Sequence, residues 1–336
     1  MPDLVETPVG FVSEKMASKW QLVCHYMQPI MQYYLDPDVS EIMINRFDQI
    51  FIENRQGLSH TDSVFDSENH LEKLIMQLTV ALQQDTDKPT VIDARFPDQS
   101  RACCTTTLVS PMGCTMTIRC SPQVTLSFDD LVRYQALDND MLKFIKESVL
   151  AKRNIIISGS SGSGKTTLIR ALAQFIPRYE RVLICEDTQE LFLDLPNQIP
   201  MESPKRKDID ITLSDLIKTT LRQRPDRVFV GEIRDAFACD AFLQVINTGH
   251  GGCVTSIHAN SPKDAIRRMQ YLLTKEGLIG YELAGLEIMN SVHVFIQTEK
   301  TPNGKKITSI AKIENAQEIK ILFVYDPEKN IYLKNR

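Results

Sequence analysis

Residues 154–167, NIIISGSSGSGKTT, form an apolar strand that runs into a glycine-rich loop, and this stretch decides the fold. Gly159 to Thr166 match the pattern G-x-x-x-x-G-K-[ST], and the helix-forming run TLIRALAQFI follows at once. The glycines let the backbone wrap closely, so that successive N–H groups and the helix dipole face phosphate oxygens. A flexible Gly/Ser connector is the alternative, but the flanking strand and helix favour a nucleotide-binding loop.

Each part of this loop has an expected role toward ATP. We expect the Lys165 ammonium to neutralise the β and γ phosphates, the Thr166 hydroxyl to bind Mg²⁺, and Thr167 to lie beside the α phosphate. The predicted nucleotide-binding residues of the loop are Gly159, Ser160, Ser161, Gly162, Ser163, Gly164, Lys165, Thr166 and Thr167.

Hydrolysis needs more than phosphate binding, because a water must be oriented and the developing charge stabilised. Glu186 follows the apolar run RVLIC, and Glu232 follows RVFVG. Ligands of open α/β sheets bind at the carboxyl ends of the strands, so we predict both acids as catalytic residues. Either could orient the water, and Asp187 and Glu190 are weaker candidates. Strand ends are often acidic merely because they meet solvent, but two acids behind a phosphate loop favour function.

Two histidines flank a predicted strand in residues 247–260, NTGHGGCVTSIHAN. A neutral imidazole at a strand end can donate a hydrogen bond to the γ phosphate and so distinguish ATP from ADP. The position after the strand favours His258 for this role, with His250 as the second candidate. A lone histidine is more often a core or loop residue, and no third ligand at a recognisable spacing supports a metal site.

The rest of the chain predicts two domains. Strands that are apolar throughout alternate with helices after residue 128, as in a parallel sheet that is buried on both faces. Before them, a helix over residues 11–35 that Pro29 bends, a hairpin of EIMIN and QIFIEN, a helix over 71–84 and strands near 101–107 and 115–119 predict a smaller α+β unit. We predict an N-terminal α+β domain over residues 1–122, a linker over 123–128 and an ATPase domain over 129–336.

One face of the first predicted helix is apolar, and we expect it to pack on its own domain rather than on a membrane. This face consists of Met16, Trp20, Val23, Met27, Ile30 and Tyr34.

Composition excludes several classes of function. The formal net charge is −5 over 336 residues, and aromatic residues make up 7%, which argues against broad coating of DNA or anionic lipid. No apolar run approaches the ~18 residues of a membrane span, and MPDLVETPVG is not a secretory signal. We therefore expect a cytoplasmic location, no integral membrane segment, and eight reduced cysteines without a zinc site.

Four ordered motifs resemble the hexameric secretion-motor ATPases of bacterial type II and type IV systems. They are GSSGSGKTT, CEDTQEL at 185–191, LRQRPDRVFVGEIRDAFA at 221–238, and NTGHGGCVTSIHAN. The amino-terminal half resembles the same family through DPDVSEIMIN at 36–45 and ARFPDQSRA at 94–102. EDT-x-EL and NTGH-x-G look most like the conjugal-transfer and VirB-type branch.

The resemblance implies a RecA-like P-loop motor domain preceded by a smaller, PAS-like α+β domain, assembled as a homo-hexamer with ATP between domains. In such proteins, arginines of the first domain reach the nucleotide phosphates, and Arg101 and Arg119 fall at the matching places. Cys120 stands where a basic residue is common, which is a departure from the family pattern.

As function, the resemblance implies an ATP hydrolase whose domain motions power type IV secretion or conjugative transfer. Its expected partners are inner-membrane components of that complex, which would hold it at the cytoplasmic face, and no sequence-specific nucleic-acid binding is expected. A pilus retraction or assembly motor is an alternative with the same chemistry. A nucleic-acid translocase, a small-molecule kinase, or a nucleotide-gated scaffold without significant hydrolysis would also use this loop.

Overall fold

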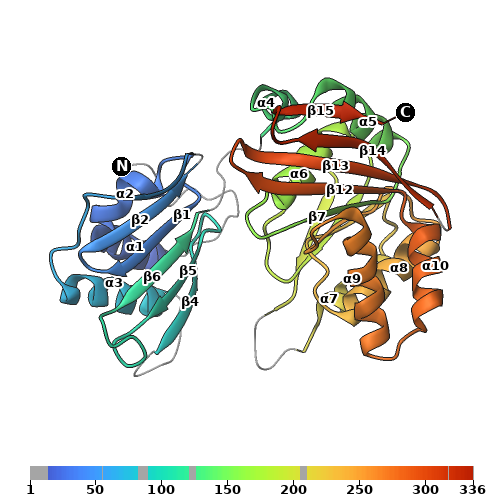
Figure 1. Cartoon of the computed structure of the whole chain (residues 1–336). Coiled ribbons are helices and arrows are strands. Elements are labelled where there is room, and N and C mark those ends of the chain that lie inside the picture. The colour runs from blue at the N-terminus through green and yellow to red at the C-terminus, as the bar shows by residue number, and fades with distance from the viewer. Residues whose placement is uncertain are drawn as a thin grey trace. The chain divides into compact units, whose positions relative to one another are not determined.

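The chain folds into two compact units, Met1–Val124 and Thr125–Arg336 (Figure 1). The computed structural model describes residues 14–54, 56–81, 90–120, 126–204, 210–316 and 318–335. We describe each unit by itself. No helix in these ranges combines the length and the apolar character that a membrane crossing requires.

The first unit is built on an antiparallel sheet with the strand order β3-β2-β1-β6-β5-β4. Its strands are β1 (Glu41–Arg46), β2 (Gln49–Asn54), β3 (Gly57–His60), β4 (Val91–Arg95), β5 (Arg101–Thr105) and β6 (Thr115–Arg119). Side chains alternate between a buried and a more exposed face, so that Ile42, Ala102 and Ile118 face the core. The predicted hairpin is confirmed as β1 and β2.

Helices α1 (Glu14–Tyr26), α2 (Met31–Tyr34) and α3 (Glu68–Ala81) accompany this sheet, and a 3₁₀ turn, η1 (Gln28–Ile30), joins the first two. The predicted helix over 11–35 is therefore interrupted rather than only bent, because Pro29 lacks the N–H that a continuous helix needs. Its predicted apolar face is buried at Trp20, Val23, Met27, Ile30 and Tyr34. Residues 11–13, the Met16 side chain and residues 82–84 of the second predicted helix lie outside the described part.

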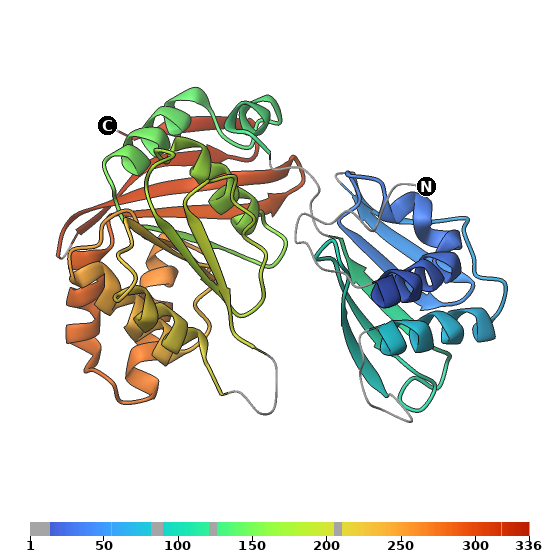
Figure 2. The same ribbon diagram turned by 180° about the vertical axis from the view of Figure 1, so that it is seen from behind.

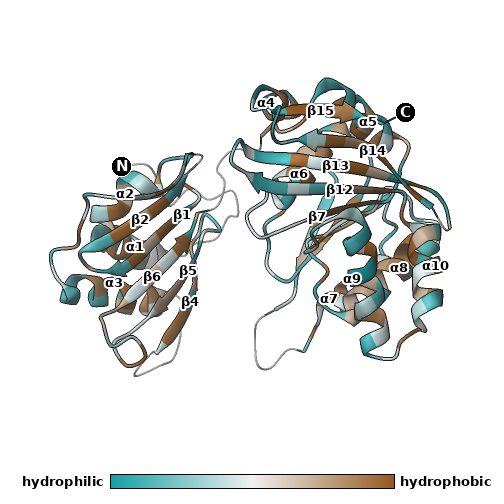
Figure 3. Cartoon of the chain, viewed as in Figure 1, coloured by the Kyte–Doolittle hydropathy of each residue, from teal (hydrophilic) through white to brown (hydrophobic). Residues whose placement is uncertain are grey.

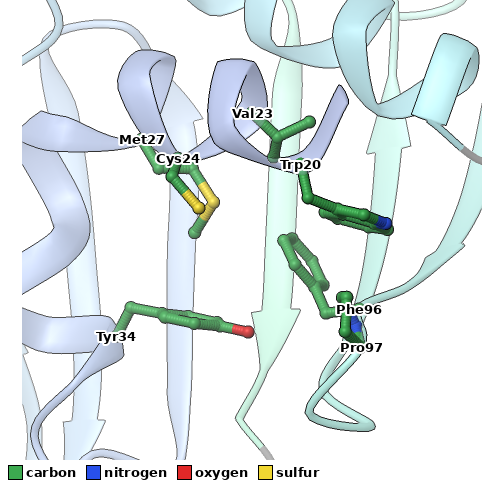
Figure 4. Close-up of a pocket in the computed structure, with 7 residues that line it drawn as sticks. All are labelled: Trp20, Val23, Cys24, Met27, Tyr34, Phe96 and Pro97. Carbon is green, nitrogen blue, oxygen red and sulfur yellow. The ribbon is translucent and has the colours of Figure 1, made fainter. Parts of the chain in front are cut away.

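An apolar pocket lies between these helices and the turn after β4 (Figure 4). The Phe96 ring packs against Trp20 and Tyr34, with both centroid distances at 5.5 Å. No charged side chain lines the pocket, so it offers nothing that would bind a phosphate. Its lining is Trp20, Val23, Cys24, Met27, Tyr34, Phe96 and Pro97.

The second unit contains a nine-stranded sheet with the order β15-β14-β13-β12-β7-β11-β10-β8-β9. The strands from β12 to β9 in this order run parallel, and β13, β14 and β15 continue the sheet as antiparallel strands. The bounds are β7 (Ile155–Gly159), β8 (Val182–Glu186), β9 (Gln198–Glu202), β10 (Arg227–Val230), β11 (Val254–Ile257), β12 (Val294–Thr301), β13 (Gly304–Asn315), β14 (Glu318–Asp326) and β15 (Ile331–Lys334).

Helices cover both faces of this sheet (Figures 1 and 2). One core packs the sheet against α4 (Phe128–Arg133), α5 (Asn139–Leu150), α6 (Lys165–Leu172) and the turn η2 (Ala173–Phe175). The other packs it against α7 (Leu213–Thr220), α8 (Ala236–Asn247), α9 (Pro262–Lys275) and α10 (Tyr281–Ser291). Hydrophobic residues accordingly dominate the central strands, whereas β12 becomes hydrophilic toward its end (Figure 3).

The start of the second unit differs from the predicted linker over 123–128. Ser127 and Asp130 form a reciprocal cap, so that α4 begins at Phe128. The Phe128 ring is buried and stacks on Phe175, with a centroid distance of 4.7 Å. Phe128 thus belongs to the core of the second unit, while residues 121–125 lie outside the described part.

Candidate nucleotide-binding site

The glycine-rich loop joins β7 to α6 at the carboxyl edge of the parallel strands. Gly164 caps α6 with φ +103°, a left-handed conformation that favours glycine. A Cβ at Gly159 would lie 2.3 Å from the backbone oxygen of Thr298, so no larger residue fits there. The strand–loop–helix setting is the one that the sequence predicts for phosphate binding.

The Lys165 side chain lies within the loop and is only 8% exposed. Its Nζ donates to the backbone oxygens of Gly159, at 3.0 Å, and Ser160, at 2.9 Å. Ser163 is buried, and its hydroxyl lies 2.8 Å from the Thr298 hydroxyl. The remaining predicted loop residues are more accessible, with Ser160, Ser161 and Gly162 exposed and Thr166 and Thr167 half-buried on the first turn of α6.

Glu186 ends β8 and is 3% exposed. Its Oε1 accepts the N–H groups of Glu190, at 2.9 Å, and Leu191, at 3.1 Å. Burial raises the pKa of this carboxyl group to about 7, although the two N–H donors act in the opposite direction. The arrangement shapes the turn after β8 around Glu186, and it leaves this carboxylate less accessible than the sequence suggested.

The same turn brings Glu190 back to the phosphate loop. The Thr166 hydroxyl donates to Glu190 Oε2 at 3.4 Å. Hydroxyl and carboxylate oxygens are ligands that Mg²⁺ prefers, so these residues fit the predicted ion. Among the described residues, no group of three or more His, Cys, Asp or Glu side chains is gathered to hold a metal.

Glu232 and His258 lie side by side at the ends of neighbouring strands, β10 and β11. His258 Nε2 lies 2.8 Å from Glu232 Oε1, and Arg234 Nη2 donates to Glu232 Oε2 at 2.9 Å. The side chain of Glu232 is 17% exposed and that of His258 is 47% exposed. Burial and the nearby charge of Lys165 lower the pKa of His258, although Glu232 opposes them, so the imidazole is neutral at pH 7.

His250 lies at the opposite edge of the sheet, because it precedes β11 whereas His258 follows it. Four strand residues separate the two edges by about 13 Å. The glycines after His250 serve packing, since a Cβ at Gly252 would lie 2.5 Å from Arg227 Nη1. Arg227 is buried and donates to Glu180 Oε2 at 2.5 Å. The weaker histidine candidate is therefore not part of the site.

Arg101 and Arg119 lie in the first unit and are register partners on β5 and β6. Their neighbours Ala102 and Ile118 are buried, so the two arginines share the face of the sheet that points away from the core. Cys120 follows directly and is half-buried. The family resemblance points to each arginine separately, whereas the structure shows that both lie on the same face of the sheet.

Two site residues, Gln297 and Thr298 in the middle of β12, where its pairing with β7 ends, are absent from the sequence-based set. Thr298 holds Ser163 of the loop, and Gln297 contacts Ser158 of β7. The signal was present, because HVFIQT has polar residues at the end of an apolar strand, just as RVLICE and RVFVGE do. An acidic residue at the end of a strand points to catalysis when only the sequence is known. The amide of Gln297 and the hydroxyl of Thr298 give no such indication.

The sequence and the fold are both similar to those of known proteins. A sequence model of the family described as "Type II/IV secretion system protein" matches residues 25–319. The chain is 32% identical over 288 residues to a "Probable conjugal transfer protein TrbB" of Sinorhizobium fredii, covering 83% of this chain and 84% of the relative. It is 27% identical over 336 residues to the "Type IV secretion system protein VirB11" of Bartonella quintana, covering 86% and 92%.

Among solved structures, the ATPase DotB of Legionella pneumophila superposes with a TM-score of 0.61 at 20% identity, covering 97% of this chain and 84% of that chain. This likeness shows the fold. It confirms the predicted fold class, a RecA-like α/β unit preceded by a smaller α+β unit.

Proposed function

The chain belongs to the type II/IV secretion system protein family, and from that premise we propose that it hydrolyses ATP to power a type IV secretion or conjugative-transfer system. One observation carries the proposal. The phosphate loop follows β7, and His258 and Glu232, whose side chains lie 2.8 Å apart, follow the adjacent parallel strands β11 and β10, so the loop and a carboxylate lie at one edge of the sheet. A phosphate-binding loop without such a carboxylate would bind nucleotide and have no group to orient water.

The proposed role of each site residue follows from its place in the site, the exposure of its side chain and the hydrogen bonds that it already makes. Lys165 neutralises the β and γ phosphates, and the loop residues 159–167 surround them. Glu232 orients the attacking water, because its side chain is partly exposed whereas the Glu186 oxygens already accept backbone N–H groups. Glu186 is a positioning residue that holds Glu190 toward Thr166.

Thr166 and Glu190 would hold Mg²⁺, which neutralises charge on the phosphates when it is bound. In this structure His258 Nε2 faces Glu232 Oε1, so its N–H would turn from this carboxylate to the γ phosphate when ATP is bound and return when that phosphate is lost. The 47% exposure of the His258 side chain supports this role.

The relatives support further proposals about the assembly, the location and the partners of this protein. The Bartonella relative is named as a type IV secretion system protein, and we infer a homo-hexameric ring that works through ATP-driven domain motions at the cytoplasmic face of the inner membrane, bound to components of the secretion complex. We also propose that Arg101 and Arg119 bind nucleotide phosphates in that assembly. The shared face of their two strands supports a joint role.

A phosphate-release assay tests the proposal on the purified full chain. With Mg²⁺, the wild type is expected to release phosphate from ATP, and Lys165→Ala is expected to abolish this release while the fold is kept. Lys143→Ala, on the exposed side of α5, is the matched control and should behave as the wild type. ATP binding without any phosphate release would instead favour the nucleotide-gated scaffold, and normal release by Lys165→Ala would overturn the site.

A further inference from the structure

The middle of β12 contains two consecutive polar residues in the interior of the sheet. Gln297 is 2% exposed and Thr298 is 3% exposed, and β12 lies between β7 and β13. A buried polar group destabilises the fold unless it is hydrogen-bonded, so the partners of these side chains explain why the residues are tolerated. All of their partners lie in the phosphate loop, in the strand that leads to it, or in the loop of His258.

Gln297 joins two loops through a single amide. Its Oε1 accepts from the Ser158 hydroxyl at 2.5 Å, and its Nε2 donates to the backbone oxygen of Ala259 at 3.1 Å. Ser158 immediately precedes Gly159 of the phosphate loop, and Ala259 immediately follows His258. The bond to Ser158 is buried and the bond to Ala259 is partly buried, and the Gln297 side chain itself is shielded from water, which makes these bonds costly to break.

Thr298 supports the same loop from the other face of the sheet. Its hydroxyl lies 2.8 Å from Ser163 Oγ and donates to the backbone oxygen of Ser158 at 3.2 Å. The pairing of β12 with β13 skips Thr308 between the pairs Gln297–Ser309 and Thr298–Ile307, which is a β-bulge. Bulges occur next to active sites because they redirect side chains, and this one lies at the step between the two polar residues.

The contacts form a chain across four adjacent strands. From Gln297 on β12 the chain passes to Ser158 on β7 and to the loop after β11, where His258 contacts Glu232 beyond β10. In the sheet these strands are neighbours in the order β12-β7-β11-β10. The strand that leads to the phosphate loop is thus connected to the loop of His258 by the two hydrogen bonds of Gln297, and His258 in turn contacts Glu232.

We propose that Gln297 is a positioning residue that couples the phosphate loop to the His258 loop, so that occupancy of the γ-phosphate position sets the placement of His258 and Glu232. This inference rests on the proposed function. The coupling is reciprocal, because a contact that places His258 for the γ phosphate must also favour binding of the triphosphate over the diphosphate. Without the Gln297 amide, the triphosphate and the diphosphate both still bind to the phosphate loop, but the preference for the triphosphate falls.

Gln297→Met tests this, because it removes both hydrogen bonds at a similar side-chain volume. Asn154→Leu is the matched control at the opposite edge of the sheet. Asn154 is 3% exposed, accepts from the Cys253 N–H at 3.1 Å and donates to the Ser291 oxygen at 2.8 Å, so it bridges neighbouring elements in the same way. Both variants are expected to lower the unfolding temperature, which a purely structural role would also do.

The decisive readout is the ratio of the Kd for ADP to the Kd for a non-hydrolysable ATP analogue, both with Mg²⁺. We expect Gln297→Met to lower this ratio by about five- to tenfold and Asn154→Leu to leave it within about twofold. An unchanged ratio in folded Gln297→Met, or an equal fall in both variants, would overturn the coupling. If the wild type itself binds no nucleotide, the proposed function fails together with the inference.

If Gln297→Met does not fold, two further variants test the same coupling. Ser158→Ala removes only the hydroxyl that Gln297 accepts from, and it should lower the same ratio by a smaller factor. His258→Ala should lower the ratio, and adding Ser158→Ala to His258→Ala should have little further effect, because residues in one network are non-additive. Fully additive effects would contradict the coupling.

Discussion

His258 Nε2 and Glu232 Oε1 lie 2.8 Å apart, although 25 residues, including the whole of α8, lie between Glu232 and His258 in the sequence. The contact exists because β10 and β11 are parallel neighbours, so that their carboxyl ends meet at one edge. It leaves the Glu232 side chain 17% exposed, in contact with His258 and Arg234. A carboxylate that is oriented and still reachable by water is suited to activate that water.

Replacing Glu232 by Gln should separate binding from hydrolysis. The amide has the size of the carboxylate but cannot accept a proton from water, so kcat is expected to fall by about 100-fold or more while the Kd for ATP stays within a few-fold. Phosphate release and equilibrium binding measure the two effects. Glu147→Gln, on the exposed side of α5, controls for loss of one negative charge. Retention of full kcat in Glu232→Gln would reassign the water-orienting role.

The raised pKa of Glu186 makes stability depend on pH. Burial raises this pKa from 4.5 to about 7, so the folded state binds the proton more tightly than the unfolded chain does. The resulting stabilisation is complete below pH 4.5 and is lost as the pH rises through 7, and it amounts to about 3 kcal/mol. Glu186→Gln removes this dependence. The free energy of unfolding of the variant, relative to the wild type, should therefore rise between pH 5 and pH 8 in denaturant titrations, and a constant difference would contradict the raised pKa.

Two glycines of the segment after α8 offer a matched comparison of packing. Gly249 and Gly252 both have positive φ, at +91° and +78°, but only at Gly252 would a Cβ meet a neighbour, Arg227. Alanine at either position costs about 1–2 kcal/mol for the backbone conformation. Gly252→Ala also displaces a buried ion pair and should cost at least about 2 kcal/mol more. Chemical denaturation of both variants measures the difference, and equal costs would mean that Arg227 moves freely.

Adjacent threonines of α6 should differ in their dependence on Mg²⁺. Thr166 contacts Glu190, whereas Thr167 is expected beside the α phosphate. We expect Thr166→Val to weaken ATP binding on the order of tenfold with Mg²⁺ and little without it. Thr167→Val should weaken binding to the same extent under both conditions. Titrations of ATP with Mg²⁺ or with EDTA make the comparison, and the proposed roles fail if the two variants respond alike.

Local sequence predicted much of the second unit. The strand–loop–helix at residues 154–175 and the two strands that precede Glu186 and Glu232 are present as expected, because their apolar runs and turn residues are strong local signals. The segments that the sequence analysis left unassigned include β9, β14 and β15, which lie toward the two edges of the sheet. Edge strands are half-solvated, so their hydrophobic pattern is weak.

Local sequence is enough to predict which residues can bind phosphate, since Lys165, Thr166 and the glycines are neighbours along the chain and the loop closes locally. The packed sheet, in contrast, selects the distant residues that join them. It brought His258 to Glu232 and left His250 at the far edge, it turned Glu186 inward, and it placed Gln297 between two loops. The reason is that strand order and the direction of each side chain depend on how the whole sheet packs, which no short stretch of sequence encodes.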